Sequence, residues 1–239
     1  MSSLNFTTYV SQISNLLVEV STGTNFNTML PGMIDYAELR IYKELDLLYT
    51  NVTDASASVT ANQRTLTLPT AQGVFIVVDE INLITPAGTG SSVGTRNPLT
   101  PVSLPWINSV YPAAGTATDT PAFFARQSDT VVTLGPSPNA AYVAEVVGTI
   151  RPANLSSANS STVLTQYFPD LFIAASMVFG SGYQRNFGGQ SDNPQMSQSW
   201  ENTYQTLFKS ADVEENRKRF QGPGWTSESP SVTATPPRV

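Results

Sequence analysis

The stretch Tyr167–Tyr183 reads YFPDLFIAASMVFGSGY and is one of the most apolar runs in a chain of 239 residues that is otherwise rich in Ser, Thr and Asn. A helix from Phe168 to Arg185 would be about 27 Å long, which approaches the thickness of a bilayer core. The run nevertheless contains Asp170, two serines and two glycines, and it falls short of the ~20 apolar residues that a membrane span needs. We therefore predict a helix that packs within protein, with no membrane contact.

Working outward, four segments show the spacing of amphipathic helices, with apolar residues three and four positions apart. Pro31 suits the first turn of the second helix, and Asp192 can cap the fourth, after a Gly-rich turn at 188–192. Arg40 and Glu44 are four positions apart, which indicates that this helix has one charged face. The predicted helices span residues 5–20, residues 31–48, a third segment from about 168, and a fourth from 192 to about 220.

The segment between the second and third helices has a different character, because Thr, Val, Pro and Gly dominate and the period falls to two. This pattern predicts an all-β insert, either a small sandwich or a barrel. The loop at 88–97 is Gly-rich, but it lacks the Lys and the spacing of a phosphate-binding loop, so we interpret it as a hairpin tip. The predicted strands are residues 64–69, 74–78, 80–85, 130–134 and 142–147.

This order of segments predicts an α+β fold. We expect residues 1–50 and 160–220 to form a four-helix bundle, with two N-terminal and two C-terminal helices, and residues 51–155 to form an inserted antiparallel β-domain. Residues 221–239 are rich in Ser, Thr and Pro with few apolar anchors, so we predict an extended C-terminal tail without a core of its own.

The composition excludes several classes of chemistry. The chain has no Cys and no His, which removes disulfides, thiolate or imidazole metal sites and triads built on these residues. We therefore predict no catalytic, cofactor-binding or metal site. The net charge of −6 argues against a nucleic-acid binder with an overall basic face. It is compatible with DNA that slides past without being gripped. No signal peptide is evident at the N-terminus.

Two features of the β-rich segment leave other functions open. Asp79 and Glu80 could supply half of a carboxylate pair for glycoside hydrolysis, although neighbouring residues of a strand point to opposite faces. Trp106, Phe123 and Phe124 could stack on bases or sugars, but no cluster of Lys or Arg is interleaved with them. A surface position for the acids, and core or subunit packing for the aromatic residues, are the simpler interpretations.

Three further stretches, taken together, resemble a known family. They are LPGMIDYAELRIYKELDLL (30–48), IRPANLSSANSSTVLTQYFPDLFIAASMVFGSGY (150–183) and WENTYQTLFKSADVEENRKRFQGPGW (200–225). They resemble head-to-tail adaptor proteins of tailed bacteriophages, closest in kind to the adaptors of short-tailed phages, also called tail tubular protein A. That family has a helix of the form Leu-Pro…Ala-Glu-x-Arg-Ile-x-x-Glu-Leu before a β region, then a Pro-Asp-Leu helix and a final helix with a Trp and a Tyr. The resemblance spans nearly the whole chain, but Asp119-Thr-Pro121 stands where the family often has Gly-x-Pro.

The resemblance implies a structural virion protein, not an enzyme. Such adaptors form a ring of about twelve copies under the portal, enclose the DNA channel and offer a platform to the tail nozzle. The implied partners are other copies of the chain, the portal protein, the nozzle protein and double-stranded DNA that passes without sequence-specific binding. The implied location is the neck of the virion, at the head-tail junction, after assembly in the host cytoplasm. The alternative is a tail-associated β-domain protein that binds a receptor or degrades carbohydrate.

Two surfaces are expected to serve this function. The third helix has more apolar surface than one bundle needs, and the surplus suits a heterologous contact with the next copy. The only basic run lies near the end of the fourth helix, where it either docks an acidic partner or is a solvated helix end favoured by the helix dipole. The expected ring-interface residues are Phe172, Met177, Phe179 and Tyr183, and the expected portal-docking residues are Arg217, Lys218, Arg219, Phe220 and Trp225.

Overall fold

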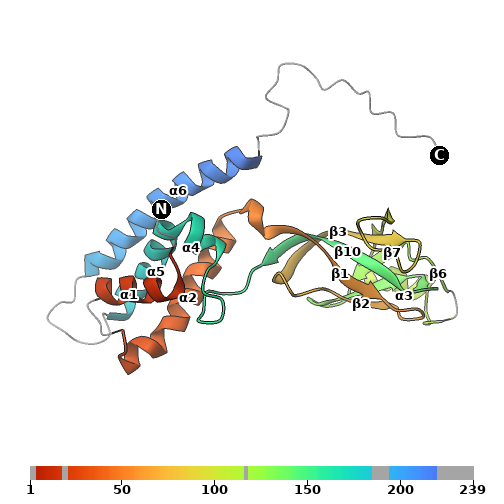
Figure 1. The fold of residues 1–239 in the computed structure, drawn as a ribbon, viewed down its shortest axis with the longest axis horizontal. Coiled ribbons are helices and arrows are strands. Elements are labelled where there is room, and N and C mark those ends of the chain that lie inside the picture. Colours follow the sequence, from red (N-terminus) through yellow and green to blue (C-terminus); the bar gives the residue numbers. More distant parts are fainter. Residues whose placement is uncertain (1–3, 18–20, 116–117, 185–193, 220–239) are drawn as a thin grey trace, which may run out of the picture. The chain divides into compact units, whose positions relative to one another are not determined.

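The computed structural model describes residues 4–17, 21–115, 118–184 and 194–219 (Figure 1). Contacts divide the chain into two compact units. The helical unit takes in the described parts of Met1–Leu48 and Asn154–Val239, and the β unit is Tyr49–Ala153. The chain is therefore a mixed α+β protein, as predicted. The turn expected at 188–192, with its capping Asp192, and the tail expected at 221–239 lie outside the described residues.

The helical unit is built from two parts of the chain that are far apart in the sequence (Figure 1). A short 3-10 helix, η1 (Leu48–Thr50), follows the N-terminal part at the boundary between the units. Within its described residues, the α-helices of the unit are α1 (Phe6–Leu17), α2 (Thr24–Glu44), α4 (Val163–Tyr167), α5 (Pro169–Gln184) and α6 (Pro194–Arg219).

Helix α5, which contains most of the apolar run, is the central helix of this unit. It contacts α1, α2, α4 and α6, and Tyr9 of α1 stacks on Phe172 with 4.9 Å between the ring centroids. A Cβ added at Gly180 would lie only 2.9 Å from the Met33 side chain and 3.2 Å from Leu17, so the glycine allows α1 and α2 to come close. The buried residues of α5 are Leu171, Phe172, Ala174, Ala175, Ser176, Met177, Gly180 and Ser181.

Helix α2 begins seven residues earlier than predicted, and Pro31 lies inside it instead of in its first turn. Phe26, Met29 and Leu30 are buried on the added turns, so their packing outweighs the local disruption that an internal proline causes. Helix α4 was not predicted. It begins with a reciprocal cap, in which the Thr162 and Thr165 hydroxyls each accept a hydrogen bond from the other residue's backbone N–H.

The β unit contains two four-stranded sheets, a two-stranded sheet and the short helix α3 (Leu104–Val110) (Figure 1). The sheet orders are β1-β10-β3-β4, β2-β8-β7-β5 and β6-β9. All pairs are antiparallel except β5–β7 and β6–β9. The strands are β1 (Asn51–Val59), β2 (Thr65–Thr67), β3 (Val74–Thr85), β4 (Thr95–Pro98), β5 (Thr100–Pro101), β6 (Thr118–Asp119), β7 (Phe123–Arg126), β8 (Val131–Gly135), β9 (Ser137–Pro138) and β10 (Tyr142–Arg151).

The two larger sheets share one hydrophobic core, to which Leu83 and Val146 contribute from the first sheet and Phe124 and Leu134 from the second. The two predicted strands 74–78 and 80–85 are one continuous strand, β3. The loop predicted at 88–97 joins the antiparallel strands β3 and β4, which confirms a hairpin, but the tip is shorter than predicted because residues 95–97 already belong to β4.

Along Val74–Glu80, β3 pairs with β10 on one side, and no described strand pairs with its other side. Arg126 occupies part of this open edge. Its Nη1 donates to the carbonyl oxygen of Ile76 at 2.9 Å, and its Nη2 donates to that of Phe75 at 3.1 Å. A side chain therefore satisfies two backbone acceptors at a point where the ladder of strands stops.

Candidate functional site

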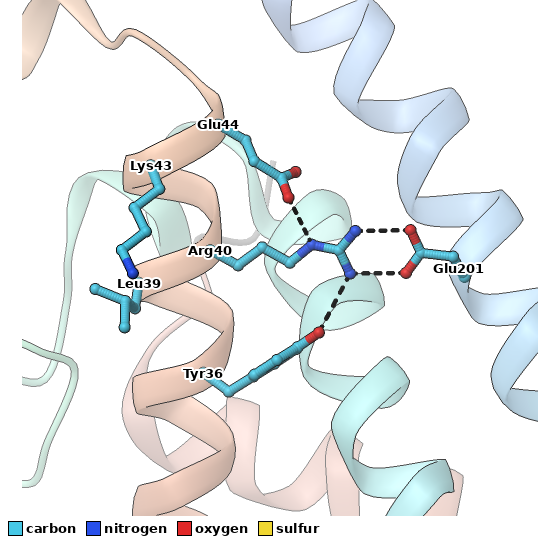
Figure 2. Close-up of a pocket in the computed structure, with 6 residues that line it drawn as sticks. All are labelled: Tyr36, Leu39, Arg40, Lys43, Glu44 and Glu201. Carbon is cyan, nitrogen blue, oxygen red and sulfur yellow. Dashed lines mark hydrogen bonds and ion pairs between the residues drawn. The ribbon is translucent and has the colours of Figure 1, made fainter.

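The charged residues of α2 form a bridge to α6 (Figure 2). Both helices contact α5, which lies behind the bridge. Arg40 donates to both carboxylate oxygens of Glu201, from Nη1 at 2.7 Å and from Nη2 at 2.6 Å. Its Nε donates to Glu44 at 3.0 Å, so the two residues form an ion pair along the charged face of α2. Two-point contact between a guanidinium and a carboxylate is a strong and orientation-specific form of hydrogen bonding.

An aromatic ring completes the surroundings of the guanidinium. The Arg40 Cζ lies 4.0 Å from the centre of the Tyr204 ring, within the range of a cation–π contact. The Tyr204 hydroxyl donates to the second oxygen of Glu44 at 2.7 Å. We call Arg40, Glu44, Glu201 and Tyr204 the polar bridge. It joins residues about 160 positions apart in the sequence, so it connects the two parts of the helical unit.

Arg40 and Glu201 of the polar bridge keep their charges near neutral pH. Hydrogen bonds from Arg40 lower the pKa of Glu201 to about 2, and the same bonds raise the pKa of Arg40 above its already high ordinary value. Burial, followed by the hydrogen bond to Glu44, raises the pKa of Tyr204. A catalytic acid or base works best with a pKa near the operating pH, and these shifts lead away from it. The arrangement therefore serves as a fixed connection.

Two other carboxylates of the helical unit accept hydrogen bonds from backbone N–H groups, and these bonds also connect the two parts of the unit. Glu38 Oε1 accepts the N–H of Leu155 at 3.0 Å, and Glu215 Oε2 accepts the N–H of Leu48 at 3.0 Å. Residues 37–45 correspond to the pattern Ala-Glu-x-Arg-Ile-x-x-Glu-Leu, which we call the motif 37–45. Its charged residues Glu38, Arg40 and Glu44 each bind a residue from the C-terminal part of the chain. This contact pattern gives the motif a physical role in assembling the helical unit.

A solvent-open hollow of about 510 Å³ lies over the polar bridge (Figure 2). Beside it, Tyr36 of α2 and Phe179 of α5 form an aromatic pair, with ring centroids 5.4 Å apart and 36% of each residue exposed. The hollow is lined by Tyr36, Leu39, Arg40, Lys43, Glu44 and Glu201. Aromatic residues such as Tyr and Phe are enriched at protein interfaces, whose rims are polar.

The predicted ring-interface residues have different positions. Phe172 and Met177 are 0% exposed and pack in the core of their own chain. The expectation that they meet a neighbouring copy is therefore corrected, because α1, α2 and α6 cover the apolar surface that the sequence left unassigned. Phe179 is exposed as part of the aromatic pair. Tyr183 is on α5, and its side chain lies outside the described part of the chain.

The predicted docking residues also divide into two groups. Lys218 pairs with Glu215 at 2.6 Å and with Glu214 at 3.2 Å, and Arg219 pairs with Asp46. Arg217 is exposed and forms no ion pair with a described residue. Phe220 and Trp225 lie outside the described residues. Of the basic run, only Arg217 has a charge that is not already neutralised by the described part of its own chain.

The features that suggested other functions do not converge on a site. Asp79 and Glu80 are exposed on β3, Phe124 is buried in the core, and Trp106 packs edge-on against Phe123 at 5.0 Å. Among the described residues, no three potential metal-binding side chains gather into a group. The helices of the described segments are all too short or too polar to span a membrane.

Comparison with models of protein families gives a match to this chain. The model of a protein family described as SU10 adaptor protein matches residues 4–226, which is nearly the whole chain. None of the curated proteins compared with the chain matches it.

Proposed function

Because the chain belongs to the SU10 adaptor protein family, a family of structural phage adaptors, we propose that it joins the portal of the phage head to the tail nozzle. In this proposal about twelve copies form a closed ring around the DNA channel, at the neck of the virion. The observation that carries the proposal is the family match over residues 4–226, which covers both units. As a phage adaptor the chain is a virion component that contacts other virion proteins.

The proposed subtype is the adaptor of short-tailed phages, of the tail tubular protein A kind. We take residues 1–50 and 160–220 to act as a four-helix bundle domain, residues 51–155 as the inserted β-domain, and residues 221–239 as an extended tail that docks on the portal. The proposal further places assembly in the host cytoplasm. The acidic net charge of −6 supports a channel through which double-stranded DNA passes without sequence-specific binding.

The proposed ring contact uses the aromatic pair. Tyr36 and Phe179 offer exposed apolar surface, and the adjoining hollow presents Lys43, Glu44 and Glu201 to solvent. A head-to-tail contact between such a patch and a different surface of the next copy generates a ring when the rotation closes. Tyr183 remains a candidate for the same contact.

The proposed portal contact uses Arg217 together with Phe220 and Trp225 of the tail. Arg217 supplies a cation without a described partner. Aromatic residues are frequent anchors of protein interfaces. A segment that becomes ordered on binding can wrap a large surface, at a cost in conformational entropy.

Electron microscopy of the purified chain and binding to isolated portal rings test this function. We expect wide rings, and we expect a chain truncated after Gln221 to remain folded but no longer bind portal rings. Arg217→Glu should weaken portal binding, whereas Lys209→Glu, on the same helix, is the matched control. A chain that stays monomeric at all concentrations and does not bind portal rings would contradict the proposal.

A further inference from the structure

Glu38 is a buried carboxyl side chain that is only partly satisfied by hydrogen bonds. It is 1% exposed. Its Oε1 accepts the Leu155 N–H, whereas its Oε2 has no hydrogen-bond partner. A buried carboxylate is costly unless it is paired or fully hydrogen-bonded. This environment therefore favours the protonated, neutral form of the side chain.

The other buried carboxylates among the described residues are better satisfied. Glu145 is paired with Arg96 at 2.7 Å, and Glu215 is paired with Lys218 at 2.6 Å. Asp54 accepts a hydrogen bond on each of its oxygens. The contrast shows that burial alone does not distinguish Glu38, and that the combination of an oxygen without a hydrogen-bond partner and the absence of a paired cation does.

The sequence explains why no cation is at hand. Arg40 is the first basic residue of the chain, and residues 152–184 contain neither Lys nor Arg. Helices α1, α4 and α5, as well as the segment that carries Leu155, therefore have no cation to offer. Arg40 itself is bound to Glu44 and Glu201.

The groups that interact electrostatically with Glu38 do not offset its charge. They are Asp35, on the same helix, and Tyr9 of α1, whose hydroxyl donates to Ser176 at 2.9 Å. The remaining titratable groups of α4 and α5 are Tyr167, Asp170 and Tyr183, and residues 152–166 contain no titratable side chain. All of these groups are acidic or neutral, so ionised Glu38 would meet no opposite charge.

The position of Glu38 gives its ionisation a structural consequence. Leu155 follows directly on Asn154, with which the helical unit resumes after the β unit. One turn earlier on α2, Asp35 accepts a hydrogen bond from the Asn154 side chain. Two side chains of α2 therefore hold the chain at the point where it returns to the helical unit.

We propose that Glu38 is a proton-operated latch. When Glu38 is protonated, it holds residues 154–155, where the chain re-enters the helical unit, against α2. When Glu38 is ionised, this attachment loosens. Burial raises the pKa of Glu38 from 4.5 to about 7, and it outweighs the opposing effect of the Leu155 hydrogen bond, which by itself favours the carboxylate. The folded chain thus keeps a proton that the unfolded chain releases. The stabilisation is complete below about pH 4.5 and is lost as the pH rises to about 7.

Hydrogen exchange measured by mass spectrometry on the full chain, between pH 5 and pH 8, tests the latch. After correction for intrinsic exchange, protection of residues 153–162 should fall by up to about tenfold per pH unit as the pH rises to 7. Glu38→Gln keeps an acceptor for Leu155 but cannot ionise. In this variant the protection of residues 153–162 should therefore stay constant between pH 5 and pH 8. Glu145→Gln, a change at an equally buried carboxyl in the β unit, should leave the wild-type pH dependence at 153–162 unchanged.

A second measurement does not depend on any variant. Carbon-13 NMR of the Glu38 carboxyl in the wild-type chain should show titration well above 4.5. Titration near 4.5, or the same pH dependence in Glu38→Gln as in the wild type, would overturn the proposal. If Glu38→Gln fails to fold, Glu38→Met provides the uncharged comparison.

Discussion

The two units of this chain solve the same folding problem in different ways. The β unit comes from one continuous stretch, Tyr49–Ala153, and its strands pair within that stretch. The helical unit comes from two stretches separated by the whole β unit, and side chains join them across more than 100 positions. The difference teaches that the β unit can be specified locally, whereas the helical unit needs both ends of the chain at once.

The polar residues reflect this division. In the β unit, the buried Glu145 pairs with Arg96 inside a single sheet. In the helical unit, Glu38, Arg40 and Glu44 each reach over to the C-terminal part. Charged side chains pair with specific partners at specific distances, so they select one alignment of helices where apolar contacts would accept several.

Dividing the chain should have the largest effect on this comparison. A fragment of residues 49–153 is expected to fold by itself, because its core and both main sheets lie within it. Residues 1–48 alone are expected to remain unfolded, because α5 supplies the core that α1 and α2 pack against. Circular dichroism and NMR spectra of the two fragments check this. If the fragment 49–153 does not fold, the conclusion that the β unit is specified locally is wrong.

Truncation of a single core side chain should lower the stability of the unit that contains it and leave the other unit unchanged. Phe172→Ala removes a fully buried ring that stacks on Tyr9, and it should lower the free energy of unfolding of the helical unit by about 3–5 kcal/mol. Denaturant titration followed by NMR can monitor each unit separately. Phe124→Ala is the matched change in the β unit, and the two variants should each affect their own unit.

Removing the cation of the polar bridge should cost about 1.5–3 kcal/mol, the range for hydrogen bonds to charged groups. Arg40→Met leaves Glu201 and Glu44 without their partner, and it also removes the contact with Tyr204. Arg40→Lys should recover only part of the loss, because an ammonium cannot make the two-point contact. Denaturant unfolding measures both variants. Equal stability of the wild type, Arg40→Met and Arg40→Lys would show that the polar bridge does not stabilise the helical unit.

The stability contributed by the polar bridge should fall as the pH is lowered, whereas the stability contributed by Glu38 falls as the pH is raised. The pKa of Glu201 is lowered from 4.5 to about 2, so its contribution to stability is present above about pH 4.5 and is lost as the pH falls to about 2. Wild type and Glu201→Gln should therefore differ in stability near pH 6 and converge near pH 2. Thermal unfolding across this range provides the measurement.

The smallest effects are expected in the basic run. Arg219→Ala should cost about 0.2–1 kcal/mol, because its pair with Asp46 is solvent-exposed. Arg217→Ala should change stability by less than about 0.5 kcal/mol while weakening binding to portal rings. A loss of stability from Arg217→Ala as large as that from Arg219→Ala would assign Arg217 to the fold.

Local patterns predicted much of the secondary structure. The alternation at 142–147 corresponds to β10, and the spacing in residues 5–20 corresponds to α1. The charged face shared by Arg40 and Glu44 was predictable because residues four positions apart are neighbours on a helix surface. Pro31 was misplaced because a proline looks the same to a local pattern in a first turn and in a helix interior, and packing around it decides which occurs.

Long-range contacts could not be predicted in this way. Nothing local to Arg40 indicates that Glu201, 161 positions later, is its partner. The apolar excess of α5 was visible, but the number of helices that cover it was not, and Phe172 and Met177 were therefore assigned to an interface instead of to the core. Glu38 has no counterion because the segments around it contain no Lys or Arg. The sequence shows this only once the structure has identified which segments these are.

The guanidinium of Arg126 has a consequence for behaviour at high concentration. A strand that ends its pairing early leaves main-chain groups able to recruit a strand from any passing molecule, which is how many proteins begin to aggregate. By gripping the carbonyls of Phe75 and Ile76, Arg126 blocks that route with a charged, well-hydrated group. At high concentration this part of the β3 edge is therefore less open to pairing with a strand of another molecule.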